Sequence, residues 1–344
     1  MLEIALLSPF TLTLDGQPLK LPSRRTEALF VYLLRNPKPH AREILADLFW
    51  DELPQGKAQG NLRVLLANLR RELTPYVTIT RQSAAFNGDS DHHVDLTLLE
   101  ESLAITRGEI DRDGALARTT AANLATALQR YQGELLPGFH LREGQGFAEW
   151  LATEREWLWT RVVEALDDLA TEYLQWGDYR AGVEQAQRLV TLDPLHEEGH
   201  QLLMQLWAAD GQISTALAQY ERCMHLLDEE LSVPPHPFTT ELYRQMLAGV
   251  WRAPVTATQT VVPSPLVISH NLPRELTPFL GRATELATLC EYLLDPAYPL
   301  VTLVAEGGSG KTRLAQAAAR RLQTHQPTPF PDGIWFVSLV ALQA

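Results

Sequence analysis

The sequence has little cysteine and no long uncharged apolar run, and both shortages exclude classes of protein. Only two cysteines, Cys223 and Cys290, occur among 344 residues, so we expect buried free thiols rather than a disulfide framework. No window approaches about 18 uncharged apolar residues, and the N-terminus lacks a basic region followed by an apolar stretch. We therefore expect a cytoplasmic protein with no membrane partner.

Patterns of catalytic or metal-binding residues are equally scarce. His92-His93 and the pair His196 and His200 lack the HExxH context of a zinc enzyme, so these histidines are expected to be structural. No nucleophile stands at a recognisable spacing from a base. The sequence thus predicts that this chain is not an enzyme. Slow ATP hydrolysis is expected, if at all, in a longer parent protein.

The net charge of −13 is unevenly distributed along the chain. Residues 1–96 are neutral overall, residues 97–250 carry −14, and residues 251–344 carry +1. Because charge acts locally, the acidic total does not exclude nucleic-acid binding by the first part.

Residues 1–96 combine short strands with three helices. Alternating apolar residues predict three strands before Leu21, after which Ser23 caps a helix that ends near Arg35. A second helix over residues 42–50 is expected to bury Ile44, Leu45, Leu48 and Phe49. A third helix follows, and then a strand pair with Arg81 near its tip, an order that suggests a winged helix.

The third helix, "KAQGNLRVLLANLRREL", has one apolar and one cationic face. Leu62, Leu65, Leu66, Leu69 and Leu73 form a stripe, and basic residues lie away from it. A cationic helix can enter the major groove, but a solvated arginine face would give the same pattern. The candidate DNA-binding residues are Arg24, Arg25, Lys57, Gln59, Arg63, Arg70, Arg71 and Arg81.

A family resemblance favours DNA binding. "LDGQPLKLPSRRTEALFVYLL", "LADLFWDELP" and "NLRVLLANLRREL" resemble the OmpR-type winged helix of bacterial activators that include antibiotic-pathway regulators. The resemblance implies double-stranded DNA as the partner. It departs at the wing, where Ser83-Ala84-Ala85-Phe86 replaces the family's usual Gly-Tyr pair.

Residues 97–250 have a helical period and an internal repeat. Gly177-Asp178-Tyr179 recurs 34 residues later as Gly211-Gln212-Ile213, and Gly182 recurs as Ala216. This spacing is typical of tetratricopeptide repeats, in which small residues allow paired helices to approach closely. "GELLPGF" and "LDPLHEEGHQLLMQLWAADGQISTALAQYERC" resemble the bacterial transcriptional activation domain, BTAD, which implies self-association or contact with RNA polymerase.

Residues 251–271 contain three prolines and no clear period, which indicates a linker. Residues 272–344 then show "FLGR", an apolar strand "PLVTLVAE", the loop "GGSGKT", a helix over residues 311–323 and a second strand "GIWFVSLVAL". Strand, glycine-rich loop and helix in this order predict a phosphate-binding loop, although Ala305 replaces the first glycine of the motif.

This segment resembles the start of a STAND or NB-ARC-type NTPase, which implies ATP and Mg²⁺ as ligands. The candidate nucleotide-binding residues are Arg282, Gly307, Gly308, Gly310, Lys311, Thr312 and Arg313, with Thr312 also binding Mg²⁺. Two strands cannot complete a doubly wound sheet, so we expect a truncated domain with poor ATP affinity in this chain.

The sequence therefore predicts a multidomain, mainly α chain. Its parts are an α+β winged helix (1–96), a tetratricopeptide-like helical domain (97–250), a linker (251–271) and a truncated α/β P-loop segment (272–344). The leading hypothesis is a DNA-binding transcriptional regulator, an activator, controlled by an ATP-binding switch. The alternatives are a signalling NTPase whose winged helix binds protein, and a repeat scaffold. RNA polymerase and a second copy of the chain, bound through the helical domain, are further candidate partners.

Overall fold

The computed structural model describes residues 1–141, 144–253, 272, 283–295, 297–298, 300–304, 311–323, 330 and 333–336. The chain divides into two compact units, residues 1–256 and residues 257–344. The described residues are mainly helical, with twelve helices and seven short strands.

A small sheet opens the first unit. Its strands stand in the order β3-β2-β1-β7, with β1 parallel to β7 and the other pairs antiparallel. Asp15 and Gly16 both adopt positive φ at the turn between β2 and β3, as a tight hairpin requires. The strands are β1 Leu2–Ala5, β2 Thr11–Leu14, β3 Gln17–Leu19 and β7 His92–Val94.

Three helices and a second sheet follow, and the bounds of the first two helices were predicted. The side chain of Ser23 accepts a hydrogen bond from the Thr26 amide and so caps the first helix. The second sheet has the order β4-β6-β5. The elements are α1 Arg24–Arg35, β4 His40–Ala41, α2 Arg42–Trp50, α3 Gln55–Leu73, β5 Val77–Ile79 and β6 Ser83–Phe86.

Two details of this region differ from expectation. The strands β4 and β7 were not predicted, because two or three residues are too short to show a period of two. The prediction that Ile44 is buried was wrong, since 56% of its side chain is exposed. The buried face of α2 is instead formed by Leu45, Ala46, Phe49 and Trp50.

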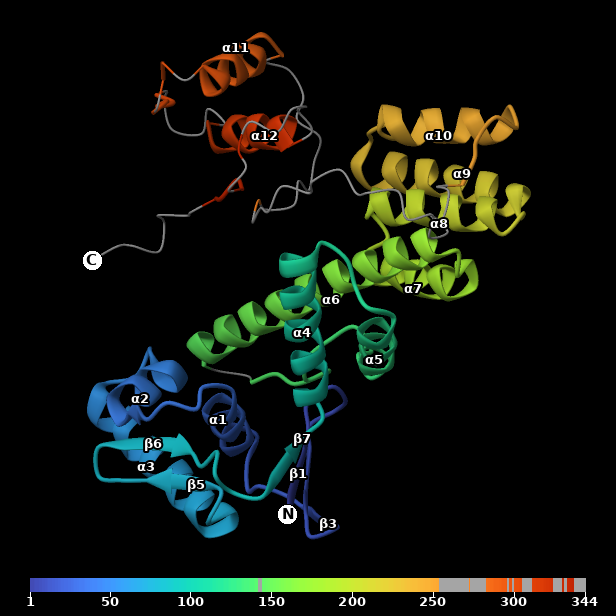
Figure 1. Ribbon diagram of the computed structural model, residues 1–344. Helices are drawn as coiled ribbons and strands as arrows, with labels where there is room; N and C mark the ends of the chain where they lie inside the picture. Colours follow the sequence, from blue (N-terminus) through green and yellow to red (C-terminus); the bar gives the residue numbers. More distant parts are fainter. Residues whose placement is uncertain are drawn as a thin grey trace. The chain divides into compact units, whose positions relative to one another are not determined.

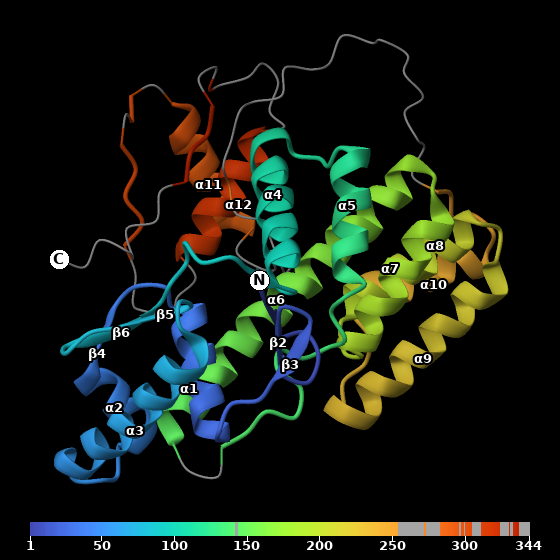
Figure 2. The same cartoon turned by 90° about the horizontal axis from the view of Figure 1, so that it is seen from below.

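Seven helices complete the first unit (Figure 1). The longest, α6, packs against α2 near its start and against α7 and α8 further along. Figure 2 shows α7, α8, α9 and α10 grouped at the end of α6 that lies away from α1, α2 and α3. The helices are α4 Thr97–Asp113, α5 Arg118–Leu128, α6 Gln145–Trp176, α7 Tyr179–Leu192, α8 Glu197–Ala209, α9 Ile213–Leu231 and α10 Pro237–Leu247.

The 34-residue spacing coincides with equivalent structural positions. Gly177 and Gly211 both have positive φ, 77° and 81°, in the turns before α7 and α9. A Cβ on Gly182 would lie 2.5 Å from Leu206 Cδ2, and Ala216 is fully buried. Small residues therefore stand where neighbouring helices approach most closely.

One hydrophobic core runs from Leu2 to Leu189 and includes residues of α1, α2, α3 and α6. It passes residue 96 without a break, because Val94, Leu96 and Leu99 all belong to it. Domain boundaries at residues 96, 250 and 271 stay predictions. For residues 1–253, the packing joins the first three helices firmly to the helices that follow.

The described part of the second unit contains α11 Ala283–Leu294 and α12 Lys311–Gln323. Leu289, Cys290, Leu314, Ala318 and Leu322 form a small core between them. The strand expected at Val301–Val304 is not formed, and Ile334 makes only a single β-bridge. A strand needs a ladder of backbone hydrogen bonds to a neighbour, and Val304 is instead 88% exposed.

Candidate nucleic-acid interface

The helix α3 supplies most of the candidate site, and its sequence explains how it is oriented. The apolar residues of α3 face the core, as predicted, and are buried: Ala58, Leu62, Leu65, Leu66, Leu69 and Leu73. This stripe anchors one side of the helix against α1 and α2. The side chains of Lys57, Arg63, Arg70 and Arg71 are consequently exposed.

The exposed side of α3 is strongly cationic. The helix carries four basic residues and one acidic residue, Glu72. Glu72 is already paired, because its Oε1 accepts a hydrogen bond of 2.7 Å from Arg71 Nε. Within the described residues, Lys57 and Arg63 have neither an ion pair nor a side-chain hydrogen bond. Their charges are therefore available to an anionic partner.

Two arginines brace the hairpin formed by β5 and β6. Arg70 Nη2 donates to the backbone oxygen of Ile79 at 2.7 Å, and Arg42 Nη2 donates to the backbone oxygen of Thr80. Thr80 Oγ1 also accepts hydrogen bonds from the amides of Gln82 and Ser83. These bonds fix the hairpin beside α3, with Arg81 exposed at its tip.

A cavity of about 370 Å³ lies between the start of α2, the face of α3 and the hairpin tip. Arg42, Arg63 and Arg81 all line it, together with Glu43, Gln59 and Gln82 among others. The N-cap of α2, Ala41, has no side-chain hydrogen bond to the helix, and the amide of Arg42 donates instead to the Gln82 backbone oxygen at 3.0 Å. Arginine side chains and helix-start amides together suit an anion such as a phosphate.

Arg42 is a candidate residue that sequence reasoning missed. The Nε of Arg42 is buried without a hydrogen-bond partner. Its Nη2 donates to the backbone oxygen of Thr80, which lies 38 residues further along the chain. The only signal in the sequence was its place at the first position of a helix that has no capping side chain.

Arg24 and Arg25 lie apart from the other candidates. Arg24 donates to Glu27 at 3.1 Å and to the backbone oxygen of Gly138 at 3.3 Å, and its guanidinium lies 4.0 Å from the centre of the Phe139 ring. The Arg25 guanidinium lies 5.6 Å from the Trp50 ring centre. The two residues thus contact the segment before α6 and the end of α2, respectively.

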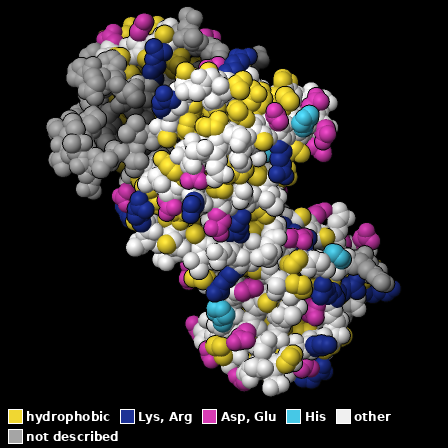
Figure 3. Space-filling view, turned by 90° about the vertical axis from the view of Figure 1, so that its right-hand side faces the viewer, with side chains coloured by type: hydrophobic (Ala, Val, Ile, Leu, Met, Phe, Trp, Pro, Cys, Tyr) yellow, Lys and Arg dark blue, Asp and Glu magenta, His cyan; other side chains and the backbone are white. Residues whose placement is uncertain are grey.

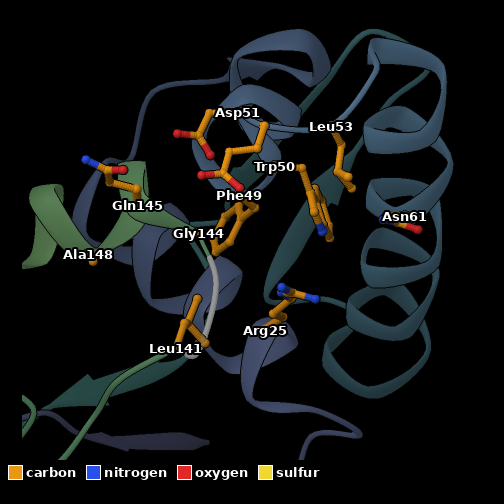
Figure 4. Close-up of a pocket in the computed structure, with 11 residues that line it drawn as sticks. Arg25, Phe49, Trp50, Asp51, Leu53, Asn61, Leu141, Gly144, Gln145 and Ala148 are labelled. Carbon is orange, nitrogen blue, oxygen red and sulfur yellow. The ribbon is translucent and has the colours of Figure 1, made fainter.

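A second cavity, of about 520 Å³, occupies this other flank of α3 (Figure 4). Arg25, Trp50, Asn61, Leu141 and Gly144 are among its lining residues, so it lies where the helical segment meets α1–α3. None of its lining residues lines the arginine cavity beside the hairpin. The expected set of eight DNA-binding residues is therefore divided, with six on α3 and the hairpin and two on the other flank.

The predicted nucleotide-binding residues are only partly described. Arg282, Gly307, Gly308 and Gly310 lie outside the described residues. Lys311, Thr312 and Arg313 form the first turn of α12, which begins and ends where the sequence predicted, and Thr312 and Arg313 are exposed. Binding of ATP or Mg²⁺ there stays a prediction.

Other polar groups that the sequence assigned to structural roles are buried. Burial raises the pKa of the Cys223 thiol to about 12, and burial also raises the pKa of Cys290. His200 is 1% exposed, lies 2.9 Å through Nε2 from the Pro194 oxygen, and has a pKa lowered by burial. In the described part of the chain, no three His, Cys, Asp or Glu side chains are grouped to hold a metal ion.

No helix among the described residues is long and apolar enough to cross a membrane.

Comparison with known proteins relates this chain to bacterial regulators. Residues 94–247 match the bacterial transcriptional activator domain family. The regulatory protein AfsR of Streptomyces coelicolor is 27% identical over 349 aligned positions, which cover 98% of this chain and 34% of AfsR. The transcriptional regulatory protein EmbR of Mycobacterium tuberculosis is 25% identical over 256 positions, which cover 72% of this chain and 63% of EmbR.

A solved structure shares the fold. The structure of Mycobacterium tuberculosis EmbR in complex with a low-affinity phosphopeptide matches with a TM-score of 0.54 and 18% identity, over 72% of this chain and 65% of that one. The sequence is thus similar to the BTAD family over residues 94–247, and to the transcriptional regulators AfsR and EmbR over most of its length. It spans about a third of the length of the AfsR proteins that it matches.

Proposed function

We propose that this chain, whose residues 94–247 match a bacterial transcriptional activator domain, binds double-stranded DNA in a sequence-specific manner and activates transcription. The observation that carries this proposal is the exposed cationic side of α3 beside a braced, arginine-tipped hairpin. In this proposal residues 1–96 are a winged helix, with α3 as the helix that enters the major groove.

Each part of the interface has a chemical task in this proposal. Arg63 hydrogen-bonds a guanine edge, because a guanidinium can donate to O6 and N7 together. Arg42, Arg81 and the start of α2 neutralise backbone phosphates on the hairpin side of α3, and Lys57 does so at the start of the helix. Arg70 holds the hairpin through the Ile79 oxygen and retains other donors for DNA.

The helical region, residues 97–250, is proposed as a tetratricopeptide-like module for protein contacts. Phe238, Leu247 and Val250 expose 56%, 63% and 62% of their side chains on and after α10. Figure 3 views the molecule from the side on which α8, α9 and α10 lie in Figure 1, and it shows hydrophobic side chains gathered in the upper part of that face. A second copy of the chain and RNA polymerase are the proposed partners, because exposed apolar patches commonly mark interaction surfaces.

Residues 272–344 are proposed as part of an ATP-binding switch, joined through the linker at residues 251–271. The start of α12 at Lys311 supports this, since a phosphate loop must lead directly into a helix N-terminus. Lys311 would contact the β- and γ-phosphates, and Thr312 would bind Mg²⁺. The chain is proposed to regulate rather than to catalyse.

The test begins with double-stranded DNA enriched from a random-sequence library by the full chain. Arg63→Ala should weaken binding to the enriched sequence by about 1 to 3 kcal/mol, because one guanine contact is lost. Arg107→Ala is the matched control, since Arg107 is also exposed but lies on α4. Equal affinities of Arg63→Ala and the wild-type chain would remove α3 from the interface.

Salt dependence separates this proposal from a protein-binding winged helix. Phosphate contacts release counterions, so the logarithm of the DNA affinity should fall steeply with the logarithm of the salt concentration. A repeat scaffold without a nucleic-acid role would enrich no DNA sequence at all. Either a flat salt response or failed enrichment would favour these alternatives.

A further inference from the structure

The middle of the exposed face of α3 is apolar, although both ends are cationic. Val64, near the centre of this helix, is 60% exposed. Lys57, Gly60, Val64, Ala67 and Arg71 follow one another at intervals of three or four residues and therefore share one side of the helix. The two cations lie 14 residues apart, or about 21 Å along the helix axis.

The neighbours of Val64 leave its methyl groups accessible. Gly60 and Ala67, one turn away on either side, are too small to shield it. A Cβ placed on Gly56 or Gly60 would meet no atom within 4 Å, so space is open in front of this helix. A large flat partner can consequently approach the helix backbone closely at this point.

The surroundings of Val64 decide which partner fits this exposed apolar side chain. Val64 borders a hollow that is also lined by Arg25, Trp50 and Leu65, but Trp50 and Leu65 are each only 6% exposed. A protein-docking surface normally combines several exposed apolar residues, whereas here Val64 is the exposed one, on a helix whose single carboxylate is already paired. A DNA major groove presents the opposite pattern, with phosphates along both rims and the 5-methyl group of thymine as its apolar feature.

We propose that Val64 contacts the 5-methyl group of a thymine and so makes the chain prefer a T·A base pair at one position of its binding site. The inference rests on the proposed DNA-binding function and deepens it, because it assigns a base preference to a residue without charge. Lys57 and Arg71 contact the phosphates on either side of that base pair.

The test uses duplexes enriched from a random library by the full wild-type chain, with each thymine replaced in turn by deoxyuridine. Deoxyuridine keeps every hydrogen-bonding group and lacks only the methyl group. The wild-type chain should bind about fourfold more weakly at one position, which corresponds to one buried methyl group. Val64→Ala should bind the thymine and deoxyuridine duplexes at that position equally.

Two controls make the outcome specific. Val233→Ala removes a valine that is 43% exposed and lies beyond α9, so its response to deoxyuridine should match that of the wild-type chain. The thermal unfolding of Val64→Ala should resemble that of the wild-type chain, because an exposed side chain contributes little to the core.

The failure of this inference differs from that of the proposed function. If Arg63→Ala loses affinity but no deoxyuridine substitution affects the wild-type chain, DNA binding by α3 stands and the role of Val64 is wrong. The role is also wrong if Val64→Ala keeps the wild-type sensitivity at the critical position. If no duplex is enriched, both the proposed function and this inference are overturned.

Discussion

Arg35, at the end of α1, shows how single side chains join the two halves of the first unit. Its guanidinium lies 2.6 Å from Glu100 of α4 and 2.9 Å from Glu154 of α6, and 16% of the Arg35 side chain is exposed. Burial alone would lower the pKa of Arg35, but the two carboxylates outweigh it and raise the pKa. This arginine was not among the sequence candidates, because its partners lie far along the chain.

Replacement of Arg35 by methionine should lower the free energy of unfolding by about 3 to 5 kcal/mol, since two carboxylates would keep their partly buried places without a cation. Urea denaturation measures this. Arg107→Met is the control, because the Arg107–Asp111 pair is largely exposed and should contribute at most about 1 kcal/mol. Equal losses in both variants would show that Arg35 does not hold the helices together.

Tyr131 gives a prediction for alkaline conditions. Its hydroxyl donates to the Gly133 oxygen at 2.8 Å, and burial, followed by the charge of Glu134, raises its pKa to about 12. An unfolded tyrosine loses its proton near pH 10, so the unfolded state binds fewer protons between about pH 10 and 12. The free energy of unfolding should therefore fall as pH rises through this window.

Tyr131→Phe should make this pH dependence smaller, because the phenylalanine has no proton to lose. Urea denaturation near pH 9 and near pH 11 measures the difference for both proteins. The loss of the hydrogen bond lowers stability at both pH values, so only the difference between them is informative. An identical pH dependence would contradict the assigned role of Tyr131.

At the scale of elements, α6 is the part that connects the candidate DNA-binding region to the helices α7 and α8. It extends from Gln145 to Trp176, over 32 residues. Its start approaches α2 so closely that a Cβ on Gly146 would lie 2.9 Å from the backbone oxygen of Leu48. A backbone oxygen cannot move aside as a side chain can, so this contact requires glycine.

Gly146→Ala and Gly108→Ala should consequently change stability in opposite directions. Both glycines lie in helices, but a Cβ on Gly108 would meet no atom within 4 Å. Gly108→Ala should stabilise the protein by about 0.5 to 1 kcal/mol through helix propensity. Gly146→Ala should destabilise it by about 1 to 3 kcal/mol through overpacking against α2.

Circular dichroism during thermal unfolding compares the two alanine variants directly. If both variants melt above the wild-type temperature, α6 does not press against α2 as closely as described. If Gly146→Ala melts earlier and also binds DNA more weakly, the contact between α2 and α6 positions the interface as well as stabilising the fold.

At the scale of the whole molecule, the proposed ATP switch depends on residues beyond the candidate DNA-binding region. In a longer parent protein with a complete ATP-binding domain, Lys311→Ala should abolish binding of ATP with Mg²⁺, because the β- and γ-phosphates lose their cationic partner. Thr312→Ala should weaken mainly the metal-dependent part of binding. Isothermal titration of that parent protein, with and without Mg²⁺, measures both effects, whereas the present chain should bind ATP only weakly.

Lys38→Ala serves as the control for the ATP titration, since Lys38 is an exposed lysine between α1 and β4. ATP binding that survives in Lys311→Ala would contradict the assignment of the phosphate loop. Titration of ATP against a preformed complex with enriched DNA then shows whether nucleotide and DNA binding are coupled, as a switch requires.

The local features of the fold could be predicted from the amino-acid sequence. Ser23 and Asn36-Pro37 set the limits of α1, the leucine spacing oriented α3, and the glycine spacing located the turns before α7 and α9. These features depend on residues within a few positions of one another, where capping, helical period and backbone conformation act directly. The bounds of α12 were predicted for the same reason.

Contacts between residues that are far apart in the chain could be read only from the folded structure. In the folded structure Arg24 and Arg25 lie apart from the arginines of α3, and Arg42 contacts the hairpin. Ile44 is exposed, and β1 pairs with β7. None of these has a local signature, because each depends on contacts between segments that are distant in sequence. Packing against α6 and the hairpin, rather than residue type, determines which cations lie together beside α3.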